Sequence, residues 1–227
     1  MLLYRFRPFN QHTITELLTE KLHFSHPSTW NDPFEWDRDG KDVGTRYTCF
    51  ATNKNSGPQT IEEKDILQNI LMWSHYAESH KGICVEYEWD SQVYDTFETA
   101  ALFGIERNTI SKSQPHKLSK TKGGAYGTNI NYSSNIFGTH FYKYECWSYE
   151  NEFRLWHDCE NIPYTENIPY TEIGLKIKAI YCGVKFEESQ IETLKIIGRE
   201  RDFEIFTGKV ENYNSIDFTN TGAVERT

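Results

Sequence analysis

The chain has 227 residues, of which 37% are hydrophobic and 15% aromatic, and its formal net charge is −9 at pH 7. This length suits one large domain, and the many aromatic rings can supply a full core, which excludes a chain that is disordered throughout. The acidic net charge argues against non-specific binding of nucleic acid by the body of the protein.

Five cysteines are spread along the chain without a Cys-x-x-Cys spacing. Their odd number and wide spread favour buried, reduced thiols over a disulfide framework or a zinc site. The N-terminal apolar run is short and interrupted by arginines, so it does not resemble a signal peptide. No segment reaches the length of a transmembrane helix. We therefore expect a cytoplasmic protein that does not associate with a membrane.

The N-terminal part of the chain is predicted to contain short strands and two helices. Apolar and β-branched runs predict strands at residues 2–6, 22–25, 47–51 and 83–87. Thr13-x-x-Glu16 is typical of a capping box and predicts a helix that begins at Thr13. A second box, Thr60-x-x-Glu63, predicts a longer helix that places Trp73 on its buried stripe.

The middle of the chain is the part in which the sequence least indicates regular structure. Residues 103–138 are rich in Gly, Asn, Ser, Thr and Lys, and a loop of this length is often a lid or a specificity insert. The segment 107–122 contains five Lys or Arg and no acidic residue. Its composition favours a solvated loop, and the alternative is a flap that contacts phosphate. Residues 161–166 are repeated without change as 167–172, which we interpret as a duplication that lengthens a loop.

The C-terminal part is again predicted to be rich in strands. They are expected at residues 140–146, 152–157, 175–182, 203–206 and 210–218, with a helix at 187–198. Strands outnumber helices without regular alternation, which is typical of an α+β fold, and the absence of Gly-x-Gly-x-x-Gly and P-loop motifs disfavours a Rossmann or P-loop enzyme. We predict one α+β domain over residues 1–218, with a mixed or antiparallel sheet, a few packed helices and a flexible insert at about 103–138. A frayed tail is expected at 219–227.

Glu150 and Glu152 form a candidate catalytic pair. They are separated by one residue where a loop enters a strand, so both are expected to point the same way. Paired carboxylates can stabilise a cationic centre by Coulomb attraction. The alternative is that one of them forms a salt bridge with Arg154 on an edge strand.

His75 and His80 lie at the predicted end of the second helix. Metal-binding histidines on a helix prefer a spacing of four residues, and these are five apart, so we predict that they bind no metal. His75 lies off the buried stripe of the helix, which makes it the better candidate for a ligand cleft.

A second polar cluster follows Trp30. Asn31-Asp32-Pro33 is a turn former, because Asn and Asp side chains bond to nearby backbone and Pro fixes φ. Asp32 and Glu35 also stand beside several aromatic residues, and aromatic walls around carboxylates are typical of a ligand cleft. The turn and the cleft are both open interpretations of this cluster.

Four motifs occur in order along the chain: Leu3-Tyr4-Arg5-Phe6, Trp30-Asn31-Asp32-Pro33-Phe34-Glu35, Trp73-Ser74-His75-Tyr76-Ala77-x-x-His80-x-Gly82 and Trp147-x-x-Glu150-x-Glu152-x-Arg154. In this order they resemble a bacterial and phage family catalogued as domain of unknown function 2971. The resemblance covers roughly residues 2–198. It implies no activity, since none is established for that family.

The opening strand, first helix and second strand also resemble the start of ADP-ribosyltransferase folds. That resemblance implies NAD as the cofactor, a ribosyl oxocarbenium ion stabilised by Glu152 with Glu150 as its partner, and Arg5 as a phosphate ligand. The sequence departs from the pattern, because Arg5 replaces a histidine and no Ser-Thr-Ser strand occurs. This resemblance and the motifs above lead us to predict catalytic and cofactor-binding residues. The predicted catalytic residues are Glu152, Glu150, His75 and Tyr76. The predicted cofactor-binding residues are Tyr4, Arg5, Asn31, Asp32, Glu35, Trp73, Ser74 and His80.

Three functions therefore stay open. The first is an ADP-ribosyltransferase-like or NAD-glycohydrolase-like activity in phage–host conflict, with a nucleic-acid or protein acceptor near residues 107–122. The second is a metal-dependent hydrolase or nuclease that uses Asp32, Glu35, His75 and His80. The third is a non-catalytic module that binds a small nucleotide-like ligand or a partner. Neither the substrate nor the oligomeric state follows from the sequence.

Overall fold

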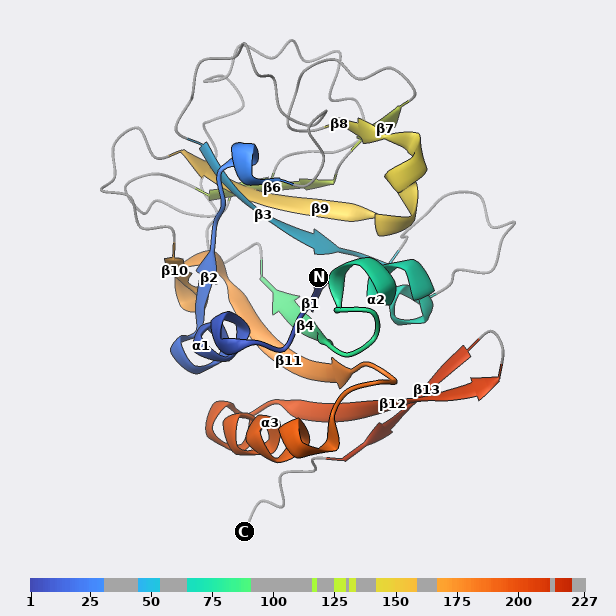
Figure 1. Ribbon diagram of the computed structural model, residues 1–227. Coiled ribbons are helices and arrows are strands. Elements are labelled where there is room, and N and C mark those ends of the chain that lie inside the picture. The colour runs from blue at the N-terminus through green and yellow to red at the C-terminus, as the bar shows by residue number, and fades with distance from the viewer. Residues whose placement is uncertain are drawn as a thin grey trace. The chain divides into compact units, whose positions relative to one another are not determined.

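The computed structural model describes residues 1–30, 45–53, 65–90, 116–117, 125–129, 131–133, 142–158, 167–212 and 215–221. These residues form helices and strands that do not alternate regularly, which confirms the predicted α+β class (Figure 1). Two compact units divide the chain. The first unit contains Met1, Lys21–Phe50 and Trp89–Leu175, and the second contains Leu2–Glu20, Ala51–Glu88 and Lys176–Thr227. The prediction of a single domain stays a prediction.

The second unit contains a run of paired strands. Their order is β13 (Ser215–Asn220), β12 (Glu204–Asn212), β11 (Leu175–Cys182), β4 (Ile83–Trp89) and β1 (Leu2–Arg7). β1 pairs with β4 in antiparallel register over its whole length, β11 pairs with β12 in parallel, and β12 pairs with β13 as an antiparallel hairpin. Pairs run in both directions, so the predicted mixed sheet is confirmed.

Helix α1 (Gln11–Thr19) begins two residues before Thr13, where the predicted capping box starts. Its N-cap is Asn10, whose side chain accepts a hydrogen bond from the Thr13 backbone N–H. The Thr13 hydroxyl instead donates to the Pro8 carbonyl at 2.8 Å. Glu16 lies buried against β1 and β4.

The predicted second helix is interrupted in the structure. A short 3₁₀ helix, η2 (Ile66–Gln68), is followed by α2 (Ile70–Tyr76), because the Asn69 side chain accepts hydrogen bonds from the backbone N–H groups of Leu71 and Met72 and starts a new helix. The Thr60 to Glu63 box lies outside the described residues. Trp73 is fully buried, as predicted, between Phe6 and Phe218.

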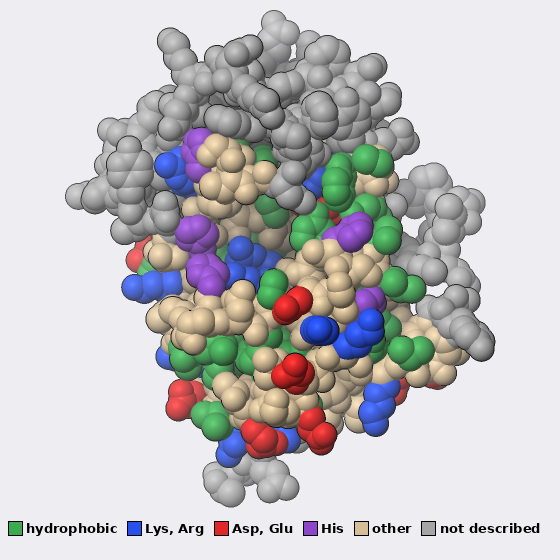
Figure 2. Space-filling view, in the orientation of Figure 1, with side chains coloured by type: hydrophobic (Ala, Val, Ile, Leu, Met, Phe, Trp, Pro, Cys, Tyr) green, Lys and Arg blue, Asp and Glu red, His purple; other side chains and the backbone are tan. Residues whose placement is uncertain are grey.

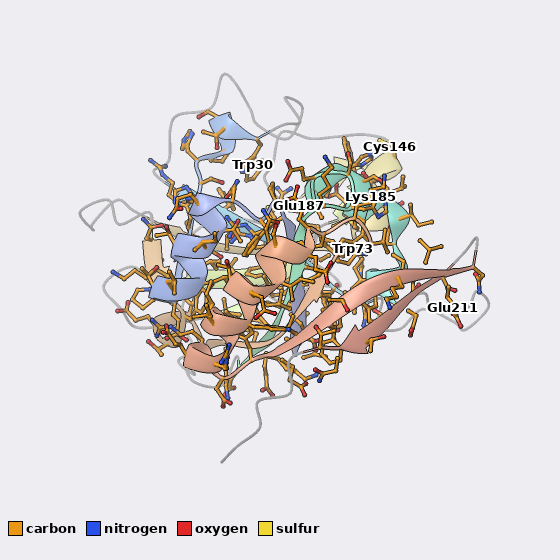
Figure 3. The ribbon with its side chains drawn as sticks, turned by 60° about the horizontal axis from the view of Figure 1, so that its bottom comes forward. Trp30, Trp73, Cys146, Lys185, Glu187 and Glu211 are labelled. Carbon is orange, nitrogen blue, oxygen red and sulfur yellow. The ribbon has the colours of Figure 1, made fainter. Side chains whose placement is uncertain are left out.

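Helix α3 (Glu188–Arg201) lies beside β12 in Figure 1 and buries Leu194 and Ile197. Acidic and basic side chains are interspersed over its outer surface (Figure 2). The β12–β13 hairpin extends away from this helix, and Figure 3 places Glu211 at its far end. On β13, the Gln68 side chain bonds to both backbone groups of Ile216, donating to its carbonyl at 2.9 Å and accepting from its N–H at 2.8 Å.

The first unit has its own strands. β3 (Thr45–Ala51), β9 (Glu152–Asp158), β6 (Ala125–Asn129) and β5 (His116–Lys117) pair in that order, and β6 is antiparallel to β9. β7 (Asn131–Ser133) pairs with β8 (Tyr142–Tyr144), and β2 (Lys21–His23) pairs with β10 (Asn167–Pro169). The remaining elements are the 3₁₀ helices η1 (Pro27–Thr29), η4 (Glu145–Glu150) and η5 (Tyr170–Ile173).

Two predictions about loops need correction. Parts of the 103–138 insert are strands, since β5, β6 and β7 lie there. The second copy of the duplicated hexapeptide is a structural element, because Asn167–Pro169 form β10 and Tyr170 is buried. β13 also continues to Asn220, so its last two residues lie in the predicted tail. Among the described residues, no helix combines the length and apolarity needed to span a bilayer.

Candidate functional site

Four buried ionisable side chains form a network in the first unit. Lys143 comes from β8, Glu150 from the last residue of η4, and Glu152 and Arg154 from β9. The Lys143 Nζ lies 2.6 Å from Glu150 Oε2 and 3.2 Å from Glu152 Oε2. Arg154 donates from Nε to Glu152 Oε1 at 2.5 Å and from Nη2 to Oε2 at 3.0 Å, so this pair is bidentate. None of the four is more than 5% exposed.

The backbone brings these groups together in a way that the sequence did not predict. Glu152 and Arg154 are alternate residues of one strand and share a face, as expected. Glu150 is not in the strand: it ends a 3₁₀ helix, and Asn151 turns the chain with a left-handed φ of 43°. The two carboxylates therefore meet because both bind the Lys143 ammonium, rather than because they alternate along a strand.

The network keeps Glu152 ionised. Burial alone would raise the pKa of this carboxyl, but the charges of Arg154 and Lys143 outweigh burial and lower it to about 2. The Cys49 thiol also donates to Glu152, and burial followed by the Glu152 charge raises the pKa of that thiol far above its ordinary value. Cys49 is thus an un-ionised hydrogen-bond donor rather than a nucleophile.

Aromatic rings cover the two cations of the network. The Trp30 ring lies over the Arg154 guanidinium, with 4.3 Å from Cζ to the ring centroid, and meets Tyr47 edge-to-face at 5.2 Å. The Trp147 ring centroid lies 5.1 Å from Lys143 Nζ. Trp30 and Trp147 are both partly exposed. The buried charges are therefore separated from solvent in part by two rings that a ligand could also contact.

In the second unit, the structure joins Ser74 to His80. Ser74 Oγ lies 3.1 Å from His80 Nε2. His80 ends a run of three left-handed residues, with φ of 49°, 54° and 72° at Glu78, Ser79 and His80. Such a run is uncommon outside glycine, and it marks stored backbone strain. Burial, and next the Lys185 charge, lower the pKa of His80, whose Nδ1 is buried without a hydrogen-bond partner.

The other predicted residues of the second unit have separate environments. His75 is exposed and meets the Tyr76 ring edge-to-face at 6.3 Å. Tyr4 is buried, and Arg5 contacts Glu16. Trp73 has no exposed surface, and its Nε1 donates to the Leu67 carbonyl at 2.8 Å. The predicted cofactor-binding role of Trp73 stays a prediction, and in the structure its ring belongs to the core.

Part of the predicted site lies outside the described residues. This holds for Asn31, Asp32 and Glu35, and for most of the basic segment 107–122. Among the residues that the structure describes, no three His, Cys, Asp or Glu side chains are grouped to hold a metal ion. We predict that the segments around Arg5, Asn31, His75 and Glu152 converge on one concave surface, and this stays a prediction.

Sequence reasoning missed several of the groups that the structure brings together. Lys143 lies between two tyrosines in β8. Only the alternation of side chains along this strand could have indicated that Lys143 is buried. The buried ion pair of Glu16 was missed because the sequence assigned this residue to a capping box. Glu86 is 2% exposed and accepts from Lys178 Nζ at 2.8 Å and from the Tyr181 hydroxyl at 2.7 Å; a charged residue in the apolar run of β4 was its one signal.

Comparison with known proteins supports the first of the two resemblances. Residues 72–155 match the family described as "Protein of unknown function (DUF2971)". No curated protein and no solved structure matches the chain. The matched segment contains both the Ser74–His80 pair and the four residues of the Lys143 network.

Proposed function

We propose that the first unit is a non-catalytic module that binds a small nucleotide-like ligand, with NAD as the first ligand to test. The observation that carries this proposal is the stacking of Trp30 on Arg154 at 4.3 Å. The bidentate contact with Glu152 holds the guanidinium in place, and the guanidinium in turn holds the indole ring. A partly exposed ring in a fixed orientation is suited to stack a nucleobase or nicotinamide, which typically contributes about 1–3 kcal/mol per base.

The contacts of Glu152 favour binding over catalysis. A carboxylate offers about four acceptor positions. Glu152 accepts two bonds from Arg154, one from Lys143 and one from the Cys49 thiol. A carboxylate that stabilises an oxocarbenium ion must face the reacting carbon with an oxygen that is not already saturated by donors. Glu152 is accordingly assigned the role of an anchor for Arg154.

Isothermal calorimetry with NAD and with two phosphate-free probes, adenosine and nicotinamide riboside, tests the proposal. Trp30→Ala should weaken binding of all three by about tenfold, since one stacking contact is lost. Trp30→Phe should retain most of the affinity. Ser25→Ala is the matched control, because the Trp30 Nε1 donates to Ser25 Oγ at 3.4 Å and this variant removes that bond without removing the ring. Absence of binding by every probe at millimolar concentration would refute the proposal.

A second candidate is an ADP-ribosyltransferase-like or NAD-glycohydrolase-like activity in the cytoplasm, acting in phage–host conflict on an acceptor near residues 107–122. One observation favours it: two buried carboxylates, Glu150 and Glu152, meet at a single ammonium, and Glu152 is ionised. An ionised carboxylate in a buried site is the group that stabilises a ribosyl cation.

Release of nicotinamide from NAD distinguishes the two candidates. The transferase-like function predicts that Glu152→Gln abolishes release while NAD binding persists. Glu86→Gln is the matched control, because it also removes the charge of a buried glutamate that binds a lysine, but in the second unit. Binding of NAD without any release of nicotinamide by the wild-type protein would exclude this second candidate.

A further inference from the structure

The end of helix α2 brings a serine and a histidine together in the second unit. The left-handed residues Glu78, Ser79 and His80 reverse the chain over the last turn of the helix, and the His80 backbone N–H donates to the Trp73 carbonyl at 3.1 Å. This reversal returns the His80 ring to Ser74, six residues earlier, with 3.1 Å between Nε2 and Oγ. Strained backbone of this kind concentrates at functional sites, where the surrounding structure holds it in place.

A second segment fixes the backbone of His80. The Lys185 N–H donates to the His80 carbonyl at 3.0 Å, and the Gly183 N–H donates to the Gly82 carbonyl at 2.9 Å. A Cβ added at Gly183 would lie 2.2 Å from the His80 carbonyl oxygen, so the segment that follows β11 lies directly against this residue. The imidazole is therefore positioned through its own backbone, on two sides, and its place beside Ser74 does not depend on a carboxylate.

The His80 ring has the properties of a general base. Among the described residues, its contact with Ser74 is its one hydrogen bond, because Nδ1 is buried without a partner. Nothing at Nδ1 fixes the tautomer, so the ring proton can reside there and leave the Nε2 lone pair to accept from the Ser74 hydroxyl. Burial, and next the Lys185 charge, lower the pKa of His80, so the ring is mainly neutral at pH 7. Ser74 and His80 are both partly exposed, which allows a small substrate to reach them.

A different Ser–His contact in the first unit shows what a purely structural pair looks like. Ser28 Oγ lies 2.7 Å from His26 Nδ1, and the same Nδ1 also accepts from the Ser28 backbone N–H at 3.2 Å. His26 is the N-cap of η1, so its lone pair serves the backbone. In the described part of the second unit, no backbone N–H donates to the ring of His80, and its Nε2 serves Ser74.

We propose that Ser74 and His80 form a catalytic dyad for acyl transfer from carboxylic esters or thioesters. Ser74 Oγ attacks the carbonyl carbon, and its proton passes to His80 Nε2. The bond from the carbonyl carbon to the ester oxygen or thioester sulfur then breaks, and His80 returns the proton to this leaving group. Water attacks the acyl-serine with His80 again as the base, which releases the carboxylic acid and restores Ser74. This activity goes beyond the function proposed for the first unit and does not depend on it.

Reaction of the intact chain with a fluorophosphonate, followed by peptide mass spectrometry, tests the dyad. This probe phosphonylates an activated serine with loss of fluoride, so the wild type should be labelled on Ser74 and not on Ser28. His80→Asn should slow labelling by at least about 100-fold, because asparagine tolerates a left-handed backbone but supplies no base. In the wild type, the labelling rate should be constant near neutral pH and should fall below pH 6.5, where His80 becomes protonated.

A second measurement uses p-nitrophenyl acetate. The wild type should show a burst of p-nitrophenol and an acetyl group on Ser74, and Ser74→Ala should lose both. Ser28→Ala is the matched control, because it removes the hydroxyl of the capping pair and should leave the burst unchanged. An unlabelled Ser74 in the folded wild type, equal labelling rates in wild type and His80→Asn, or a wild-type rate that does not fall at low pH would overturn the proposal. Trp30→Ala should leave labelling unchanged, so failure here and failure of the nucleotide-binding proposal are separable.

Discussion

Replacing Glu152 by Gln should remove the part of the pH dependence of folding stability that comes from ionisation of this carboxyl group. The pKa of Glu152 falls from an ordinary 4.5 to about 2 in the folded protein. At about 1.4 kcal/mol per pKa unit, this difference amounts to about 3 kcal/mol of stability at neutral pH. The value agrees with the roughly 3–5 kcal/mol that is typical for breaking a buried ion pair by removing one partner.

The direction follows from the sign of the pKa change. Because the folded pKa is lower than the unfolded one, the contribution is complete above a pH of about 4.5 and is lost as the pH falls toward 2. Urea unfolding of wild type and Glu152→Gln from pH 7 to pH 3 measures it. The stability difference between the two should be constant above pH 5 and should shrink below it.

A double-mutant cycle assigns the effect to the correct partner. In an Arg154→Met background, Glu152→Gln should cost less than in the wild type, because the bidentate contact is already absent. A stability difference that does not change between pH 7 and pH 3, or equal costs in the two backgrounds, would refute the reasoning that Arg154 and Lys143 hold Glu152 ionised.

Three further predictions concern the second unit. Trp73→Ala should lower the free energy of unfolding by about 3–5 kcal/mol as a core deletion, whereas His75→Ala, an exposed position, should change it by less than about 0.5 kcal/mol; chemical denaturation measures both. His80 should titrate below its ordinary pKa of 6.5 in proton NMR, so its contribution to stability is present above pH 6.5 and is lost as the pH falls; a titration at or above 6.5 contradicts this. Gly183→Ala should destabilise the fold or displace the left-handed turn, because the new Cβ would lie 2.2 Å from the His80 carbonyl oxygen, and unchanged melting would contradict this contact.

The sequence predicted those parts of the fold that depend on local patterns. Alternation of apolar residues located β1, β3, β4 and β11, and helical spacing placed Trp73 in the core. The break of the second helix at Asn69 was missed, because the spacing of apolar residues does not reveal a capping side chain in the middle of a segment. The start of α1 was misplaced because Asn10 and Thr13 are both acceptable caps, and tertiary contacts of Glu16 decided between them.

The candidate site was harder to predict because its contacts are long-range. Glu150 and Glu152 were identified as a pair. The alternative of a salt bridge to Arg154 on an edge strand was correct for the salt bridge and wrong for the edge strand, because β9 lies between β3 and β6 and both glutamates are buried. Their common partner Lys143 comes from another element, so no spacing along the chain indicates it. The match over residues 72–155 confirms the resemblance to the family of unknown function, while the ADP-ribosyltransferase resemblance stays a prediction.

The contact of Gln68 with Ile216 has a consequence for how this protein behaves at high concentration. β13 is the last strand in its run, and the outer side of such a strand presents backbone groups that can pair with another chain and begin aggregation. The Gln68 amide occupies both the N–H and the C=O of Ile216, as a neighbouring strand would. A glutamine in a 3₁₀ helix thereby protects the outer side of β13 at this position, and the side chain acts as a single-residue substitute for a covering strand.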